Sequence, residues 1–186
     1  MRRAVLLVVW LAALGPLALA EEARMTPVAT LDLRRYAGLW YEIARLPFPF
    51  QEKCAHSVVV RYAVRDDGRL AVVNECVDEN GRTRRASGVA RRADPNGPPS
   101  QLKVRFAPAF LSFLSAVWGD YWVIDLAPDY SYAVVGEPKR RYLWILSRTP
   151  RMPEPLYSEV LGRAARFYDV SRTMRTEQLQ APAPAP

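Results

Sequence analysis

The chain has 186 residues, two cysteines, one histidine and a formal net charge of +7 at pH 7. A chain of this length favours one domain. Two cysteines and one histidine are too few thiolate and imidazole ligands for a typical zinc site, and we expect neither a metal nor a cofactor. The basic residues are scattered along the chain, whereas nucleic-acid binding calls for basic and aromatic residues gathered on one face, so we expect no nucleic-acid partner.

The first 20 residues have the organisation of a secretory signal peptide. Arg2 and Arg3 form a positive start, residues 4–14 are apolar, and small residues at positions 18 and 20 mark a cleavage site. The apolar run is short for a bilayer span of about 20 residues, although a retained anchor is the alternative. We therefore expect an exported, soluble protein, periplasmic or secreted, that starts near Glu21. No cysteine stands at the cleavage site, so we expect no lipid anchor.

Export makes the two cysteines informative, because paired cysteines are common in oxidising compartments. Cys54 and Cys76 flank two successive predicted strands, and a bridge between them contributes about 3 kcal/mol in the chain-entropy model. The alternative is a reactive Cys54 thiol with His56 as its base. A nucleophile also needs an orienting group and an oxyanion site, and the sequence suggests neither.

Alternation of apolar and polar residues predicts eight short strands separated by turns that carry glycine, proline or aspartate. The strands are expected from about Trp40 onward and at 58–64, 70–76, 82–92, 102–106, 120–126, 131–135 and 142–147. Closure into an up-and-down antiparallel barrel removes both sheet edges, and eight strands can enclose one small ligand. The expected fold class is therefore all-β, with a strand-rich sandwich as the structural alternative.

One amphipathic helix is predicted after the strands. Leu156, Val160, Ala164 and Phe167 recur at helical spacing within about 153–167. This helix is expected to pack outside the barrel, since no second core exists for it. The proline- and alanine-rich end is predicted to be disordered. The expected division of the chain is a signal peptide at 1–20, an N-terminal extension at 21–32, the barrel domain at 33–176 and a tail at 177–186.

Three blocks of the sequence, in order, carry a resemblance to a known family. The segment GLWYEIAR at 38–45 is similar to the Gly-x-Trp block that opens the first lipocalin strand. Asp129 and Tyr130 fall where the second block ends. The segment YLWILSRTP at 142–150 resembles the third block of bacterial and plant lipocalins and of apolipoprotein D. The resemblance covers about residues 33–170 and implies an eight-stranded barrel that stores or transports a lipid-like molecule.

The resemblance also implies structural roles for the residues of these blocks. Trp40 is expected to close one end of the barrel with Arg148 stacked across its indole, a contact of about 0.5–2 kcal/mol. Gly38 is expected to let the chain pass close beneath that end. These residues identify the fold and are not expected to touch the ligand.

Inward-facing positions alternate along the strands of a small barrel. Counting from Trp40 and Arg148 and along the apolar faces of the other strands gives the predicted cavity residues: Glu42, Ala44, Val60, Tyr62, Tyr121, Val123, Asp125, Tyr142 and Trp144. Such a cavity suits a fatty acid, a lysophospholipid or a similar molecule, with a tyrosine or an arginine near the polar head. The alternative is an enzyme in which Glu42 and Asp125 form an acid–base pair.

The predicted connection at 108–118 is unusually apolar. Its large apolar side chains include Phe110, Leu111, Phe113, Leu114 and Trp118. An exposed patch of this kind indicates a membrane contact, a homodimer contact or a lid on the cavity. The alternative is that the loop folds back over the barrel mouth and buries itself.

Overall fold

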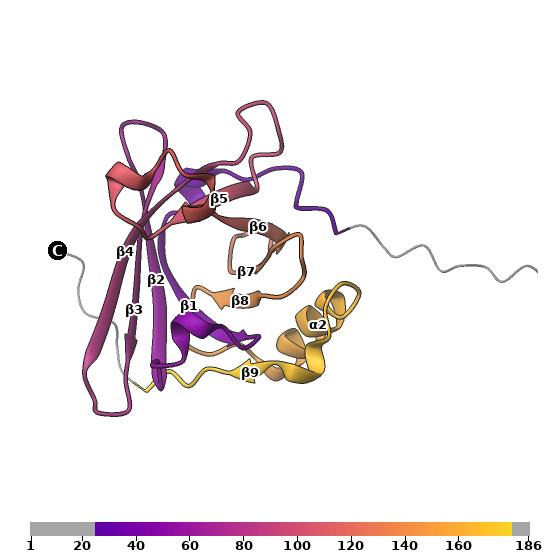
Figure 1. Ribbon diagram of the computed structural model, residues 1–186. Helices are drawn as coiled ribbons and strands as arrows, with labels where there is room; N and C mark the ends of the chain where they lie inside the picture. The colour runs from indigo at the N-terminus through magenta and orange to yellow at the C-terminus, as the bar shows by residue number, and fades with distance from the viewer. Residues whose placement is uncertain (1–24, 180–186) are drawn as a thin grey trace, which may run out of the picture.

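The computed structural model describes residues 25–179 and has the predicted eight-stranded antiparallel barrel. Each strand pairs with the next in sequence, and β1 pairs with both β8 and β2, so that the sheet closes on itself (Figure 1). The predicted signal peptide at 1–20 lies outside the described residues. The strands are β1 (Gly38–Arg45), β2 (His56–Val64), β3 (Leu70–Val77), β4 (Thr83–Arg92), β5 (Gln101–Arg105), β6 (Gly119–Leu126), β7 (Tyr132–Gly136) and β8 (Leu143–Ser147).

Helix α2 (Glu154–Ala164) packs on the outer face of the barrel, as the sequence predicts (Figure 1). Its buried side chains are Tyr157, Val160 and Ala164, which join a cluster with outward-facing residues of β1, β7 and β8. Arg163 on α2 adds a polar link, because its Nε lies 2.8 Å from an oxygen of Asp125 on β6. No helix within residues 25–179 has the length and apolar character needed to cross a bilayer.

Helix α1 (Leu33–Tyr36) closes one end of the barrel together with Trp40. The carboxylate of Asp32 caps α1 by accepting a hydrogen bond from the Arg34 amide at 2.8 Å. Trp40 is fully buried, and its Nε1 donates to the carbonyl oxygen of Tyr36 at 2.8 Å. Because Tyr36 is also fully buried against the Trp40 ring, this end is filled by packed side chains.

Arg148 holds this closed end together from outside. Its guanidinium carbon lies 3.8 Å from the centre of the Trp40 ring, so the stacking implied by the family resemblance is present. The same guanidinium donates to the carbonyl oxygens of Leu39 at 2.9 Å and Tyr36 at 3.2 Å. Gly38 has φ +100, and a Cβ there would lie 3.2 Å from Arg148 Nη1. The close passage therefore requires glycine at this position.

Asp129 and Tyr130 shape the neighbouring turn at the same end. Asp129 accepts a hydrogen bond from the Ser131 amide at 3.0 Å, while Tyr130 has φ 65 in the left-handed region. The Tyr130 ring carries the Arg35 guanidinium 4.0 Å from its centre, and its hydroxyl accepts from the Asp32 amide. Asp129 therefore stabilises the β6–β7 turn itself, and Tyr130 ties this turn to α1.

The predicted disulfide is confirmed: Cys54 and Cys76 are bonded, with 5.6 Å between their Cα atoms. The bridge joins the β1–β2 connection to the end of β3. This connection contains a short 3₁₀ helix, η1 (Pro49–Gln51), that the sequence pattern did not predict. Because Cys54 is bonded, the alternative of a Cys54 nucleophile with His56 is wrong.

The C-terminal segment, residues 174–179, fills a gap in the barrel wall. Pairing of β1 with β2 covers only residues 38–41 and 59–62, and beyond that point the two strands separate. Strand β9 (Met174–Arg175) pairs with the end of β1 after the 3₁₀ helix η4 (Val170–Arg172). On the other side of the gap, the Ser57 amide donates to the Glu177 carbonyl oxygen at 2.7 Å. The two strands are thus bridged by a third piece of chain.

Contacts across the gap continue past residue 176. The Gln178 Nε2 donates to carbonyl oxygens on both strands, to Glu42 at 2.8 Å and Val58 at 2.9 Å. At the other end, part of the predicted N-terminal extension packs on the barrel, since the Val28 amide donates to the Val123 carbonyl oxygen at 2.9 Å. Residues 180–186 of the predicted tail lie outside the described residues.

Candidate ligand-binding cavity

The barrel encloses a cavity of about 110 Å³ that is lined mostly by apolar side chains. Residues from all eight strands and from the β1–β2 connection contribute to the wall. The apolar lining consists of Phe48, Val58, Val59, Val60, Val72, Ala90, Val104, Phe106, Val135 and Leu146. The polar side chains of the lining are Glu42, Gln51, Tyr62, Asn74, Tyr121 and Trp144. An apolar wall with a few placed polar groups is the usual composition of a small-molecule site.

Five of the predicted cavity residues line this space: Glu42, Val60, Tyr62, Tyr121 and Trp144. Two others lie near the cavity without lining it. Val123 is fully buried in the barrel core. Tyr142 packs against Phe48, with 4.9 Å between the ring centres.

The predictions for Ala44 and Asp125 are wrong, and β-bulges explain both errors. The register shifts between Glu42 and Ala44, which moves Ala44 into the outer cluster beneath α2. It shifts again between Val123 and Asp125, so that Asp125 faces outward to Arg163. A bulge inserts one extra residue and reverses the alternation beyond it. Glu42 and Asp125 therefore lie on opposite faces of the wall and do not form the acid–base pair of the enzyme alternative.

Several cavity residues were missed by the sequence reasoning. Phe48 and Gln51 come from the β1–β2 connection, where no periodic pattern marks inward positions. Phe106 follows β5, and its ring lies 2.7 Å from where a Cβ on Gly88 would be. The small residues Ala86, Gly88 and Ala90 on one face of β4 were the available signal, because they leave room for a large neighbour.

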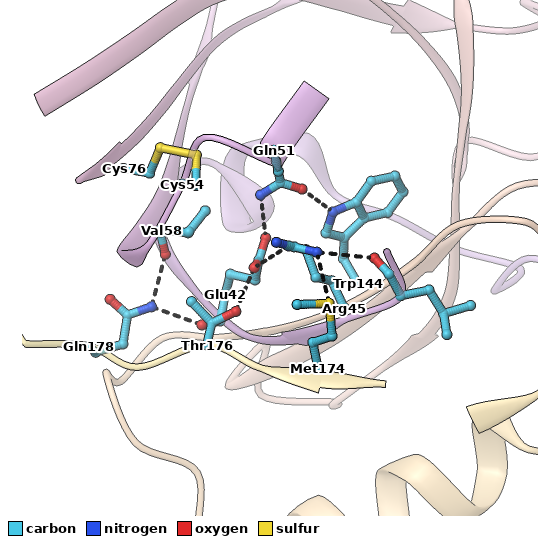
Figure 2. A network of polar contacts seen from close by, with 11 residues as sticks. Glu42, Arg45, Gln51, Cys54, Val58, Cys76, Trp144, Met174, Thr176 and Gln178 are labelled. Atoms are coloured by element: carbon cyan, nitrogen blue, oxygen red, sulfur yellow. Dashed lines mark hydrogen bonds and ion pairs between the residues drawn. A yellow bond between two sulfur atoms is a disulfide. The ribbon is translucent and has the colours of Figure 1, made fainter. Parts of the chain in front are cut away.

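Glu42 is the centre of a buried polar network beside the cavity (Figure 2). Its carboxylate accepts from Thr176 Oγ1 at 2.6 Å and from Gln51 Nε2 at 2.7 Å, and it pairs with Arg45 Nε at 3.3 Å. Gln51 in turn accepts from the indole nitrogen of Trp144 at 2.9 Å. The network therefore joins the cavity wall, the β1–β2 connection and the C-terminal segment.

The charge of Glu42 is set by opposing effects. Burial raises the pKa of its carboxyl, while the hydrogen bonds from Thr176 and Gln51 and the charge of Arg45 act in the opposite direction. Both partners of the ion pair are buried, with exposed fractions of 3% for Glu42 and 8% for Arg45. A buried pair of this kind fixes geometry more than it adds stability.

A second polar group faces the cavity from the closed end of the barrel. The Tyr121 hydroxyl lies 2.6 Å from that of Tyr36 and 2.7 Å from that of Tyr62. Burial raises the pKa of all three phenols above the ordinary value, so they are neutral at pH 7. Tyr62 and Tyr121 line the cavity, whereas Tyr36 packs behind them against Trp40.

The apolar connection at 108–118 is exposed at three of its five predicted positions. It contains the 3₁₀ helices η2 (Ala109–Leu111) and η3 (Ser115–Val117). Phe110 and Phe113 are 74% and 79% exposed, and Leu114 is also exposed. Leu111 is half-buried. The alternative that the loop buries itself therefore does not hold for its tip.

Trp118 differs from the rest of this connection, because it is buried. Two guanidinium groups lie near its ring, with the guanidinium carbon of Arg91 at 4.4 Å and that of Arg105 at 5.2 Å from the ring centre. Its indole nitrogen donates to the Ser112 carbonyl oxygen at 2.9 Å. Trp118 thus anchors the base of the loop and leaves Phe110, Phe113 and Leu114 at the tip, which we call the apolar tip.

Comparison with known proteins places this architecture in one family. Residues 31–178 match the model of the lipocalin-like domain. Temperature-induced lipocalin-1 of Arabidopsis thaliana is 40% identical over 166 residues, which covers 88% of each chain. The outer membrane lipoprotein Blc of Escherichia coli is 36% identical over 156 residues, which covers 83% of each chain. The solved structure of insecticyanin from Manduca sexta superposes with a TM-score of 0.62 at 21% identity, covering 81% of this chain and 82% of that one.

The family model spans nearly all described residues, and both relatives exceed 30% identity across most of their length. The barrel, its closed end and its apolar cavity support the binding of a small hydrophobic ligand. The chain belongs to the lipocalin family.

Proposed function

We propose that this lipocalin binds and carries a fatty acid, a lysophospholipid or a similar single-chain amphipathic molecule in its barrel. The cavity carries the proposal, because its wall is mostly apolar and holds only a few polar side chains. An apolar wall suits an acyl chain, and the few polar side chains can contact the polar part of the same molecule. Burial of the chain supplies about 25 cal/mol per Å² of apolar surface before ordering costs.

Export from the cytoplasm is part of the same proposal. The bonded cysteines support an oxidising compartment such as the periplasm or the extracellular space. The Escherichia coli relative is named as an outer membrane lipoprotein. In this chain both cysteines are joined to each other, so neither is available for an acyl thioether. The pairing of the two cysteines supports a carrier that is not held by a cysteine-linked lipid, in contrast to what the name of this relative says of the relative.

The exported protein is expected to co-purify with a fatty acid or lysolipid at about one per chain. Native mass spectrometry followed by organic extraction measures both the ratio and the ligand class. An empty barrel that also fails to take up a fluorescent fatty acid would contradict the proposal.

A cavity-filling variant makes this test specific to the barrel interior. Val104→Trp places a large ring in the cavity wall and is expected to weaken binding of the fluorescent fatty acid by about tenfold or more. Val64→Trp, at the exposed end of β2, is the matched control and is expected to bind normally. Equal binding by the two variants would place the ligand elsewhere on the protein.

We further propose that the apolar tip touches an anionic membrane surface when the ligand is collected or delivered. Its exposed aromatic rings and the net positive charge of the chain support an anionic membrane as the surface that the tip contacts. Each of these side chains contributes about 1.5–3 kcal/mol when fully removed from water. The homodimer named above is the competing use of the same surface.

The triple variant Phe110→Ser/Phe113→Ser/Leu114→Ser is expected to lose most of its co-sedimentation with phosphatidylglycerol vesicles, by about tenfold or more. Val64→Ser, a change at an apolar side chain exposed elsewhere, serves as the control. Unchanged sedimentation, together with a shift of the triple variant to a smaller size on gel filtration, would assign the tip to self-association instead.

A further inference from the structure

The three buried tyrosine hydroxyls at the closed end of the cavity have one hydrogen more than their mutual contacts use. Each neutral phenol carries one O–H donor and can also accept. The two contacts of Tyr121, to Tyr36 and to Tyr62, use two of the three hydrogens. Within residues 25–179 these three hydroxyls have no further hydrogen-bond partner. One O–H group is therefore left over.

The position of the cavity bears on which phenol carries this hydrogen, because Tyr62 and Tyr121 line the cavity and Tyr36 is not among its lining residues. If Tyr36 donates to Tyr121 and Tyr121 donates to Tyr62, the spare hydrogen is on Tyr62, which lines the cavity. If both outer phenols donate to Tyr121, the spare hydrogen is on Tyr121, which also lines it. Only the reverse chain would leave it on Tyr36, packed without an acceptor behind the cavity. A buried donor without an acceptor is unfavourable, so the arrangements that place the hydrogen on a cavity-lining residue are favoured.

We propose that Tyr62 and Tyr121 form a donor subsite at the inner end of the cavity, which receives an uncharged oxygen of the ligand, such as a carbonyl, ester or ether oxygen. This inference rests on the proposed carrier function and adds the orientation of the ligand. Among the side chains that line the cavity there is no lysine, arginine or histidine. An ionised carboxylate placed at this end would be desolvated without a cation, which is costly. The subsite therefore selects a neutral acceptor.

The proposal can be tested with two probes of equal shape. 2-Tridecanone carries a carbonyl oxygen, and 2-methyl-1-tridecene carries a methylene group in the same place. The affinity of each is measured by displacement of a bound fluorescent fatty acid. The ratio of ketone to alkene affinity is then compared between proteins, which cancels the different solubilities of the probes.

The hydrogen count gives a matched control for this experiment. Tyr62→Phe/Tyr121→Phe removes both cavity-facing hydroxyls and keeps the rings, so the ketone-to-alkene ratio is expected to fall by about threefold to tenfold. Tyr36→Phe leaves the Tyr62–Tyr121 pair with one spare hydrogen that faces the cavity in either direction. Its ratio is expected to match that of the unmodified protein.

The possible outcomes separate the two proposals. A protein that binds neither probe nor the fluorescent fatty acid contradicts the carrier function itself. Binding of both probes with the same ratio in all three proteins overturns the subsite and leaves the carrier function standing. The unmodified protein gives a second readout that needs no variant: the infrared carbonyl band of bound 2-tridecanone is expected at lower frequency than in hexane. An unshifted band also overturns the subsite.

Discussion

Glu42→Ala is expected to destabilise the protein by about 3–5 kcal/mol, the cost of removing one partner from a buried ion pair. The change leaves the Arg45 guanidinium buried without its carboxylate. It also removes the acceptor for Thr176 and for Gln51. Urea unfolding measures the effect as a lower midpoint at an unchanged slope.

Two further variants separate the charge from the packing. Glu42→Leu/Arg45→Met removes both charges and keeps comparable volume, so its stability is expected to lie well above that of Glu42→Ala, although Thr176 and Gln51 still lose their acceptor. Glu42→Gln keeps a hydrogen-bond acceptor and is expected to fall between the two. A single alanine variant as stable as the double variant would show that Arg45 does not need its partner.

Trp40→Ala is the second change with a large expected effect, a loss of about 3–5 kcal/mol. The indole is fully buried at the closed end, supports the Arg148 guanidinium on one face and donates to the Tyr36 carbonyl oxygen. Its removal opens a cavity at the point where α1 meets the barrel. Thermal unfolding is expected at a midpoint about 10 °C lower or more.

Phe50→Ala provides the comparison for Trp40→Ala, because Phe50 is 88% exposed in the β1–β2 connection. Its loss is expected to change stability by no more than about 0.5 kcal/mol. Similar midpoints for the two variants would mean that the closed end does not depend on the packed indole.

The strands and the outer helix could be predicted because each follows a regular period. From Val59 to Val64 on β2 and from Leu70 to Glu75 on β3 the pairing register is unbroken, and the observed bounds of both strands lie within two residues of those expected. Periodicity fails where the backbone departs from it. The bulges at Glu42/Ala44 and Val123/Asp125 change which positions of the strand point into the barrel, and no residue type in either strand predicts them. Assigning alternate residues to the inner and outer face from one end of a strand is therefore correct only as far as the first bulge.

The parts of the site that come from irregular chain had no signal in the sequence. Phe48 and Gln51 reach the cavity because the β1–β2 connection, tied by the disulfide, folds back over it. Strand β9 has two residues, too few for any alternation to show. Trp118 reads as one more apolar residue of its loop, and its burial depends on Arg91 and Arg105 from neighbouring strands.

The C-terminal segment has a consequence for the order in which the barrel is assembled. Neighbouring strands can pair as soon as a short turn between them closes, whereas the bonds of Gln178 to Val58 and Glu42 join residues 120 and 136 positions apart. Contacts between distant parts of a chain slow folding, because the loop must close before they form. The wall beside Glu42 is therefore expected to be completed last, after the hairpins have formed. Until then β1 and β2 stand apart at that place, and the growing barrel has a lateral slit that leads toward its interior.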